Sequence, residues 1–96
     1  MECNSRKKKR SPEEYKKLLN RLNRIEGQIR GLKNMVENDA YCIDILTQVT
    51  AADAALNSFS KELISEHIKT CVSKDIANGN FESIDELVDT LKKLMK

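Results

Sequence analysis

The sequence predicts an all-α fold with three helices per chain, in which an antiparallel helical hairpin dimerises into a four-helix bundle. Three observations predict it. Apolar residues recur at alternating spacings of three and four, which is the period of a helix and not of a strand. No Gly or Pro occurs between Gly31 and Gly79, so nothing breaks a long helix there. A chain of 96 residues with no Trp buries only a thin core alone, which favours an oligomer.

The first helix is predicted over residues 12–37. Ser11 is a favourable N-cap, Pro12 takes the first helical position, and Glu14 follows the cap by three residues, as in a capping box. The apolar positions form a seam suited to packing along another helix. They are Tyr15, Leu18, Leu22, Ile25, Ile29, Leu32 and Val36.

The second helix is predicted over residues 40–77, with Asp39 as its N-cap and Gly79 just beyond its C-terminal end. Small residues gather at its midpoint, where they let two helix axes approach closely. They are Ala51, Ala52, Ala54 and Ala55. We therefore expect this helix to cross its copy near the centre and to form the spine of the dimer.

A short third helix is predicted over residues 83–95, where Ser83 and Glu86 have the spacing of a second capping box. Residues 1–10 are polar and basic and are expected to be a flexible tail. The remaining residues, 11–96, are expected to form one helical domain.

Positive charge is concentrated at the N-terminus. Residues 1–33 hold eleven Lys and Arg against four Asp and Glu, whereas residues 34–96 hold six against eleven. A basic segment of this kind suits a polyanion such as DNA, although nuclear localisation, solubility or a solvated helix face are simpler explanations. The predicted phosphate contacts are Lys7, Lys8, Lys9, Arg10, Lys16, Lys17, Arg21 and Arg24.

Cys42, His67 and Cys71 have the spacing of a metal site shared between two chains. His67 and Cys71 are four residues apart, and Cys42 precedes His67 by nearly seven helical turns, so all three fall on one face of an uninterrupted helix. The same helix separates Cys42 from His67 by about 37 Å. Metal ligands lie only about 2 Å from the ion. Two antiparallel copies are therefore needed to close the site, and two-fold symmetry then makes two sites.

Two thiolates and one imidazole suit Cu(I), Zn(II) or another thiophilic ion. Structural zinc usually takes four protein ligands, so a set of three favours Cu(I). The simpler alternative is that the cysteines pack as small apolar residues and that the histidine is structural. An activated Cys–His nucleophile is a further alternative, but no third orienting group is evident, so we expect no enzymatic activity.

No apolar run approaches the ~18 residues of a membrane span, and the N-terminus lacks the apolar segment of a secretory signal. We expect no membrane partner and a cytosolic location. Three cysteines are an odd number, which argues against a closed disulfide framework. Cys3 has no phasing with the others and is expected to be an exposed thiol of the tail.

The residues around Cys42 resemble a known family. The stretch LNRIEGQIRGLKNMVENDAYC, from Leu22 to Cys42, is similar to the characteristic segment of the copper-sensitive operon repressor (CsoR) family. IDILTQV directly after it and HIKTCV from His67 continue the similarity, which covers nearly the whole chain after the basic tail.

This resemblance implies a bacterial, cytoplasmic, all-helical dimer of dimers that binds operator DNA without a helix-turn-helix. It also implies that Cys42, His67 and Cys71 are Cu(I) ligands, since relatives that sense sulfane sulfur lack the His and relatives that sense formaldehyde lack the second Cys. Relatives that sense nickel or cobalt use additional N-terminal ligands, often His, and His67 is the only histidine here. Tyr41 and Glu86 match positions that hydrogen-bond around the His ligand, although Glu86 would also suit its capping box.

The hypothesis from the sequence is a homotetrameric repressor whose apo form binds operator DNA and whose Cu(I) form releases it, so that copper-resistance genes are transcribed. Two alternatives stay open. One is a repressor of the same family with another inducer: zinc, nickel or cobalt, formaldehyde or sulfane sulfur. The other is a copper buffer that does not bind DNA.

Overall fold

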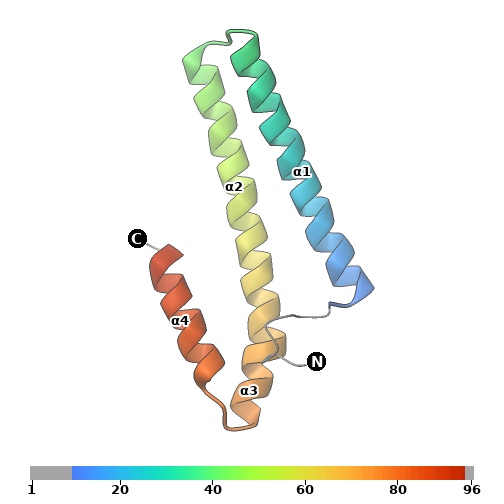
Figure 1. The fold of residues 1–96 in the computed structure, drawn as a ribbon, viewed down its shortest axis with the longest axis vertical. Coiled ribbons are helices and arrows are strands. Elements are labelled where there is room, and N and C mark those ends of the chain that lie inside the picture. The colour runs from blue at the N-terminus through green and yellow to red at the C-terminus, as the bar shows by residue number, and fades with distance from the viewer. Residues whose placement is uncertain (1–9, 95–96) are drawn as a thin grey trace. The chain divides into compact units, whose positions relative to one another are not determined.

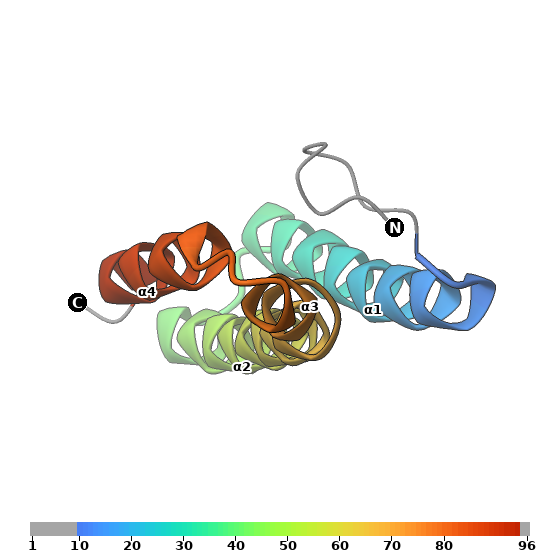
Figure 2. The same cartoon turned by 90° about the horizontal axis from the view of Figure 1, so that it is seen from below.

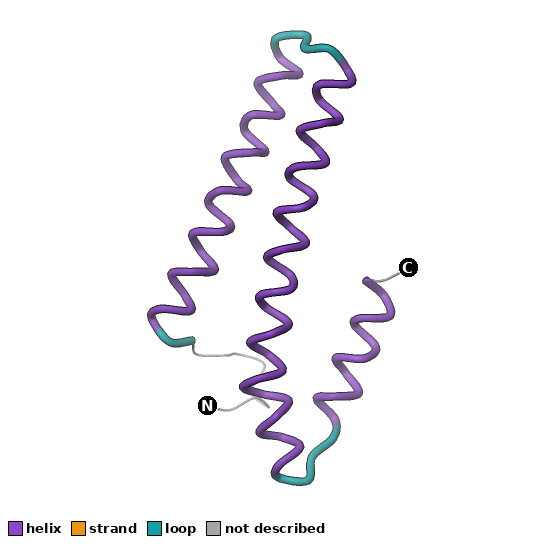
Figure 3. The backbone as a smooth tube through the Cα atoms, turned by 180° about the vertical axis from the view of Figure 1, so that it is seen from behind, coloured by secondary structure: helices purple, strands orange, loops and turns teal. Residues whose placement is uncertain are grey.

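The computed structural model describes residues 10–94, and every regular element in that range is helical. The elements are α1 (Pro12–Glu37), α2 (Cys42–His67), a π-helical segment η2 (Ile68–Val72), α3 (Ser73–Ala77) and α4 (Glu82–Leu94). Figure 3 shows these helices joined by short loops. The all-α prediction is confirmed. None of the described helices is long and apolar enough to span a membrane.

The start of α1 is the one expected from the sequence. The backbone N–H of Glu14 donates to Ser11 Oγ at 3.2 Å, and Pro12 lies in the first turn. Ser11 is therefore the N-cap, and its hydroxyl satisfies one of the N–H groups that the first turn leaves without a helical partner.

The chain divides into two compact units, residues 10–63 and residues 64–94 of the described range. In the first unit, α1 and α2 up to Leu63 lie side by side in opposite directions, as Figure 1 shows and as Figure 2 shows from below. Leu18 and Ile25 of α1 and Ala52 of α2 are its buried residues.

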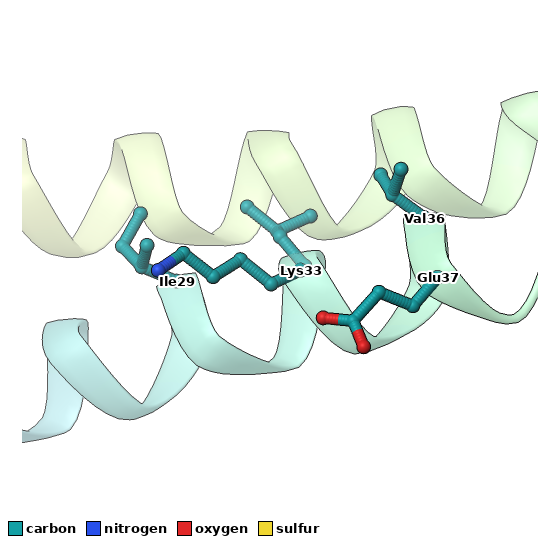
Figure 4. A pocket seen from close by; sticks show the side chains of 5 residues that line it. Ile29, Lys33, Val36 and Glu37 are labelled. Carbon is teal, nitrogen blue, oxygen red and sulfur yellow. The ribbon is translucent and has the colours of Figure 1, made fainter.

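Much of the apolar surface of this hairpin is exposed. On α2, Leu46 is 58% exposed and Val49 and Leu56 are each 44% exposed. On α1, the end of the apolar seam borders an open hollow of about 370 Å³ lined by Ile29, Leu32, Lys33, Val36 and Glu37. In Figure 4 the Lys33 side chain runs along α1 towards Ile29, and Glu37 lies beside Val36. The hairpin of one chain therefore leaves its apolar faces incompletely covered.

Asp39 has a different role from the one predicted. It is not the N-cap of the second helix but the residue just beyond α1, in the left-handed region with φ 56°. Its N–H donates to Val36 O at 3.2 Å, and the N–H of Ala40 donates to Met35 O at 2.9 Å. These two bonds are a Schellman motif, which satisfies the last carbonyls of α1.

The second unit contains the end of α2, then η2, α3 and α4. Its segment α3 ends in another Schellman motif, with Gly79 at φ 79° and bonds from Gly79 N–H to Ile76 O and from Asn80 N–H to Asp75 O. Gly79 is thus the helix stop that the sequence predicts. Across the turn, Ile84 and Leu87 of α4 line an apolar hollow of about 310 Å³ together with Ile68, Val72, Ser73 and Ile76.

The N-terminus of α4 differs from the prediction. The helix begins at Glu82, whose N–H donates to Asn80 Oδ1 at 3.0 Å, and the N–H of Asp85 donates to Phe81 O. Ser83 is therefore inside the first turn and is not the N-cap, and its Oγ has no hydrogen-bond partner. Asn80 supplies the capping oxygen because an Asx side chain readily bonds the N–H two residues on.

Candidate metal centre and DNA-binding surface

Cys42 is the first residue of α2, and its thiol is free and exposed. The N–H of Ile45 donates to Tyr41 O at 3.1 Å, so Tyr41 is the residue from which the first turn begins. The Tyr41 side chain is 70% exposed. A thiol and a phenol thus stand next to each other at the N-terminus of α2, where molecules outside the hairpin can reach them.

His67 and Cys71 lie at the other end of the same helix. His67 is the last residue of α2 and is half-buried, and Cys71 lies in η2 and is 3% exposed. Cys71 is disulfide-bonded in this structure, so it must be reduced before it can serve as a thiolate ligand. Cys42 and His67 are therefore at opposite ends of a helix of 26 residues, whereas His67 and Cys71 are one turn apart.

The segment that carries Cys71 is not α-helical, which differs from the uninterrupted helix predicted over residues 40–77. The N–H of Ser73 donates to Ile68 O, five residues back, as in a π-helix. Thr70 Oγ1 donates to Glu66 O at 2.7 Å and so competes for the carbonyl that an α-helix would pair with the Thr70 N–H. The local winding that separates these two candidate ligands is therefore altered between His67 and Cys71.

Within one chain, the described residues bring no three His, Cys, Asp or Glu side chains together as a potential metal site. Cys42, His67 and Cys71 nevertheless offer two sulfur donors and one imidazole nitrogen, a set that fits a thiophilic ion such as Cu(I). A site that used all three residues would have to combine two chains, because Cys42 and His67 lie at opposite ends of α2.

The two residues expected around the histidine ligand are both exposed. Tyr41 precedes Cys42, and Glu86 lies on α4, where its backbone carbonyl accepts a hydrogen bond from Thr90 Oγ1 at 2.9 Å. Because Ser83 is not the N-cap of α4, the capping box that would have given Glu86 a purely structural role does not form.

The basic residues predicted to contact DNA are of two kinds in α1. Lys16 and Arg24 are exposed. Lys17 and Arg21 instead contact α2: Lys17 Nζ lies 2.6 Å from Glu62 Oε1, and Arg21 Nη1 donates to Ser58 Oγ at 2.9 Å.

Of the other predicted contacts, Arg10 pairs with Glu14, with Nε 3.4 Å from Oε1. Lys7, Lys8, Lys9 and Cys3 lie outside the described residues. Sequence reasoning missed Ser58 and Glu62. A signal was available, since positions 17 and 21 of one helix and 58 and 62 of the other share the same spacing of four in an antiparallel pair.

Residues 14–93 match the model of a family described as metal-sensitive transcriptional repressors. The chain belongs to this family. It is 47% identical over 88 residues to the copper-sensing transcriptional repressor CsoR of Bacillus subtilis. The aligned segment covers 91% of this chain and 87% of the relative. The family membership makes the protein a metal-sensitive transcriptional repressor and confirms the resemblance noted in the sequence.

Two solved structures of the family have the same fold. The copper-sensing repressor CsoR with Cu(I) from Geobacillus thermodenitrificans superposes with a TM-score of 0.88 and 44% identity, covering 94% of this chain and 95% of that one. The nickel-responsive transcriptional regulator InrS gives a TM-score of 0.72 and 36% identity, covering 91% and 96%. The chain therefore has relatives that respond to two different metals, and the copper-sensing repressor is the more similar of these two.

Proposed function

We propose that this protein is a Cu(I)-responsive transcriptional repressor of the bacterial cytoplasm. Its apo form binds operator DNA, and Cu(I) releases it, so that copper-resistance genes are transcribed. The observation that carries the proposal is the donor set of Cys42, His67 and Cys71 on a chain 44% identical to a CsoR structure with Cu(I). Two sulfur atoms and one imidazole nitrogen suit Cu(I), which is soft and accepts few ligands.

The ligands come from two protomers in this proposal. Cys42 of one protomer and His67 and Cys71 of another supply one site, and the two-fold axis generates a second. The incompletely covered apolar surface of the α1–α2 hairpin supports such an association, because a second chain would cover Leu46, Val49 and Leu56. We further propose that two dimers form the tetramer that binds DNA.

In our proposal, the metal site and the DNA-binding surface are coupled through α4. If Cu(I) is bound, His67 would hold it through one ring nitrogen. The other ring nitrogen would then donate to an acceptor, which we assign to the Glu86 carboxylate, with Tyr41 beside Cys42. This hydrogen bond would move α4 and weaken DNA binding, and by linkage DNA would weaken Cu(I) binding by the same factor.

The proposed DNA contacts are basic residues of the N-terminal segment and of the first half of α1, namely Lys7, Lys8, Lys9, Arg10, Lys16, Lys17, Arg21 and Arg24. Such contacts go mostly to phosphates, so affinity should fall steeply with salt.

The test is an anaerobic Cu(I) titration of the fully reduced protein on its own promoter DNA, followed by fluorescence anisotropy. Zn(II), Ni(II), formaldehyde and a polysulfide are added in parallel. Release at one Cu(I) per protomer, with the others inactive, would support a copper-responsive repressor. Tight DNA binding that ignores Cu(I) would assign another inducer, and Cu(I) binding without promoter binding would indicate a copper buffer.

A further inference from the structure

Two contacts join the basic half of α1 to α2. Lys17 Nζ lies 2.6 Å from Glu62 Oε1, and Arg21 Nη1 donates to Ser58 Oγ at 2.9 Å. Lys17 and Arg21 are one turn apart on α1, and Ser58 and Glu62 are one turn apart on α2, so the contacts follow each other along the hairpin. Both basic residues are among those proposed to bind DNA.

The two contacts differ in what they do to the charge. Arg21 has five N–H donors and gives one to a neutral hydroxyl, so it keeps its charge and its other donors for a phosphate. Lys17 is a compact charge paired with a carboxylate, which neutralises it locally. Of the two α2 residues, only Glu62 therefore opposes an interaction between its partner and DNA.

The lysine is the more accessible member of the Lys17–Glu62 pair. The Lys17 side chain is 56% exposed and the Glu62 side chain is 22% exposed. Exposed ion pairs contribute little to stability because water screens them. A phosphate that approaches α1 can therefore reach the exposed Lys17 side chain and compete with the Glu62 carboxylate for it.

We propose that Glu62 competes with DNA phosphates for Lys17 and thereby lowers the operator affinity of the repressor. Glu62 is a positioning residue that acts through Lys17 and touches no DNA itself. This inference rests on the proposed function, because it requires that α1 bind DNA.

A merely structural ion pair and a competing ion pair predict opposite signs. If Glu62 only held α1 against α2, Glu62→Gln would loosen the hairpin and weaken DNA binding. If Glu62 competes, Glu62→Gln frees Lys17 and strengthens DNA binding about two- to five-fold, the range expected from the strength of an exposed ion pair. Each Lys17 that gains a phosphate also steepens the slope of log affinity against log salt by about 0.9.

Glu26→Gln is the matched control. Glu26 forms an exposed ion pair on α1 with Arg30, with Oε1 3.8 Å from Nη1, and Arg30 is not among the proposed DNA contacts. The control makes the same chemical change, removes the same charge and also frees a basic side chain. It therefore measures the general electrostatic gain, and the effect of Glu62→Gln must exceed it.

The experiment measures promoter affinity by fluorescence anisotropy at salt concentrations from about 50 to about 300 mM, the range over which phosphate contacts are screened. The proteins are reduced wild type, E62Q, E26Q, K17Q and the double variant K17Q/E62Q. Circular dichroism checks that each variant is helical. We expect E62Q to bind more tightly and with a steeper salt slope than E26Q, and we expect the gain to vanish in the K17Q background.

Two results would overturn the inference while leaving the proposed function intact. In the first, wild type binds the promoter and releases it on Cu(I) addition, but E62Q and E26Q have the same promoter affinity and the same salt slope. In the second, Glu62→Gln still strengthens promoter binding in the K17Q background. Wild type that does not bind promoter DNA at any salt concentration would instead overturn both the proposed function and this inference.

Discussion

The two units of the chain differ in the regularity of their helices and in the burial of their apolar residues. The α1–α2 hairpin is α-helical throughout and leaves Leu46 58% exposed. Residues 64–94 contain a π-helical segment, and that segment buries Cys71 and Val72 to 3% and 2% exposure. π-Helical turns occur often at functional sites. In our proposal, the hairpin serves association and DNA binding, whereas the irregular segment shapes the half of the proposed metal site that contains His67 and Cys71.

The largest effect is expected from a substitution that breaks the proposed dimer interface on α2. Leu46→Glu places an unpaired charge on the exposed apolar face of α2. If a second chain covers that face, burying the charge should weaken the dimer by about 3 kcal/mol, more than 100-fold in the dissociation constant. Sedimentation equilibrium measures the change.

The control for this prediction is Thr47→Glu, which adds the same charge one residue further on. Thr47 is exposed, and its hydroxyl already bonds back to Ile43 O at 2.9 Å. It lies about 100° around the helix from Leu46. Equal masses for wild type and Leu46→Glu would mean that this face is not the interface.

A smaller effect is expected when the link between metal and DNA is cut. His67→Ala should retain apo DNA affinity, because the residue is not among the proposed DNA contacts. It should lose the Cu(I)-induced drop in affinity, which for allosteric couplings is about 1–3 kcal/mol, or 5- to 150-fold. Anisotropy with and without Cu(I) measures it. A variant that binds Cu(I) and still releases DNA like wild type would contradict the relay through His67 and Glu86.

The smallest expected effect compares the two helix stops. Asp39 and Gly79 both take positive φ in Schellman motifs, but only glycine does so without steric strain. Asp39→Gly should raise the free energy of unfolding by about 0.5 kcal/mol, and Gly79→Ala should lower it by about 1 kcal/mol. An added Cβ at Gly79 meets nothing within 4 Å, so only backbone strain acts there. Urea unfolding of the reduced protein would show both, and a loss of stability in Asp39→Gly would contradict the strain argument.

Some of this structure was predictable because it depends on local chemistry. Ser11 and Pro12 define the start of α1, and Gly79 the end of α3, through capping that involves only neighbouring residues. The donor set of Cys42, His67 and Cys71 was likewise identifiable from spacing and resemblance, and it stays a proposal for this chain.

Other features were not predictable because several local choices compete. Asp39 has a side chain suited to an N-cap, but its backbone ends α1 in a Schellman motif, so α2 begins later, at Cys42. Asn80 caps α4 in place of Ser83 because its side-chain oxygen accepts from the N–H of Glu82, two residues on, so that α4 begins at Glu82. The π-helical segment Ile68–Val72 is a local change of winding that the spacing of apolar residues does not reveal. Glu62 became visible only once the register of α1 against α2 was known.

We propose that two chains share each metal site, and a dimer of two different variants can test this. Cys42→Ser and Cys71→Ser protomers are given different affinity tags, and the mixed dimer is purified and reduced. Each variant alone should bind no Cu(I) tightly. In the mixed dimer, Cys42 of one chain and His67 and Cys71 of the other would complete one site. We therefore expect one tightly bound Cu(I) per mixed dimer, against two per wild-type dimer. No tight binding in the mixed dimer would contradict it, because a site built within one chain cannot be rescued in this way.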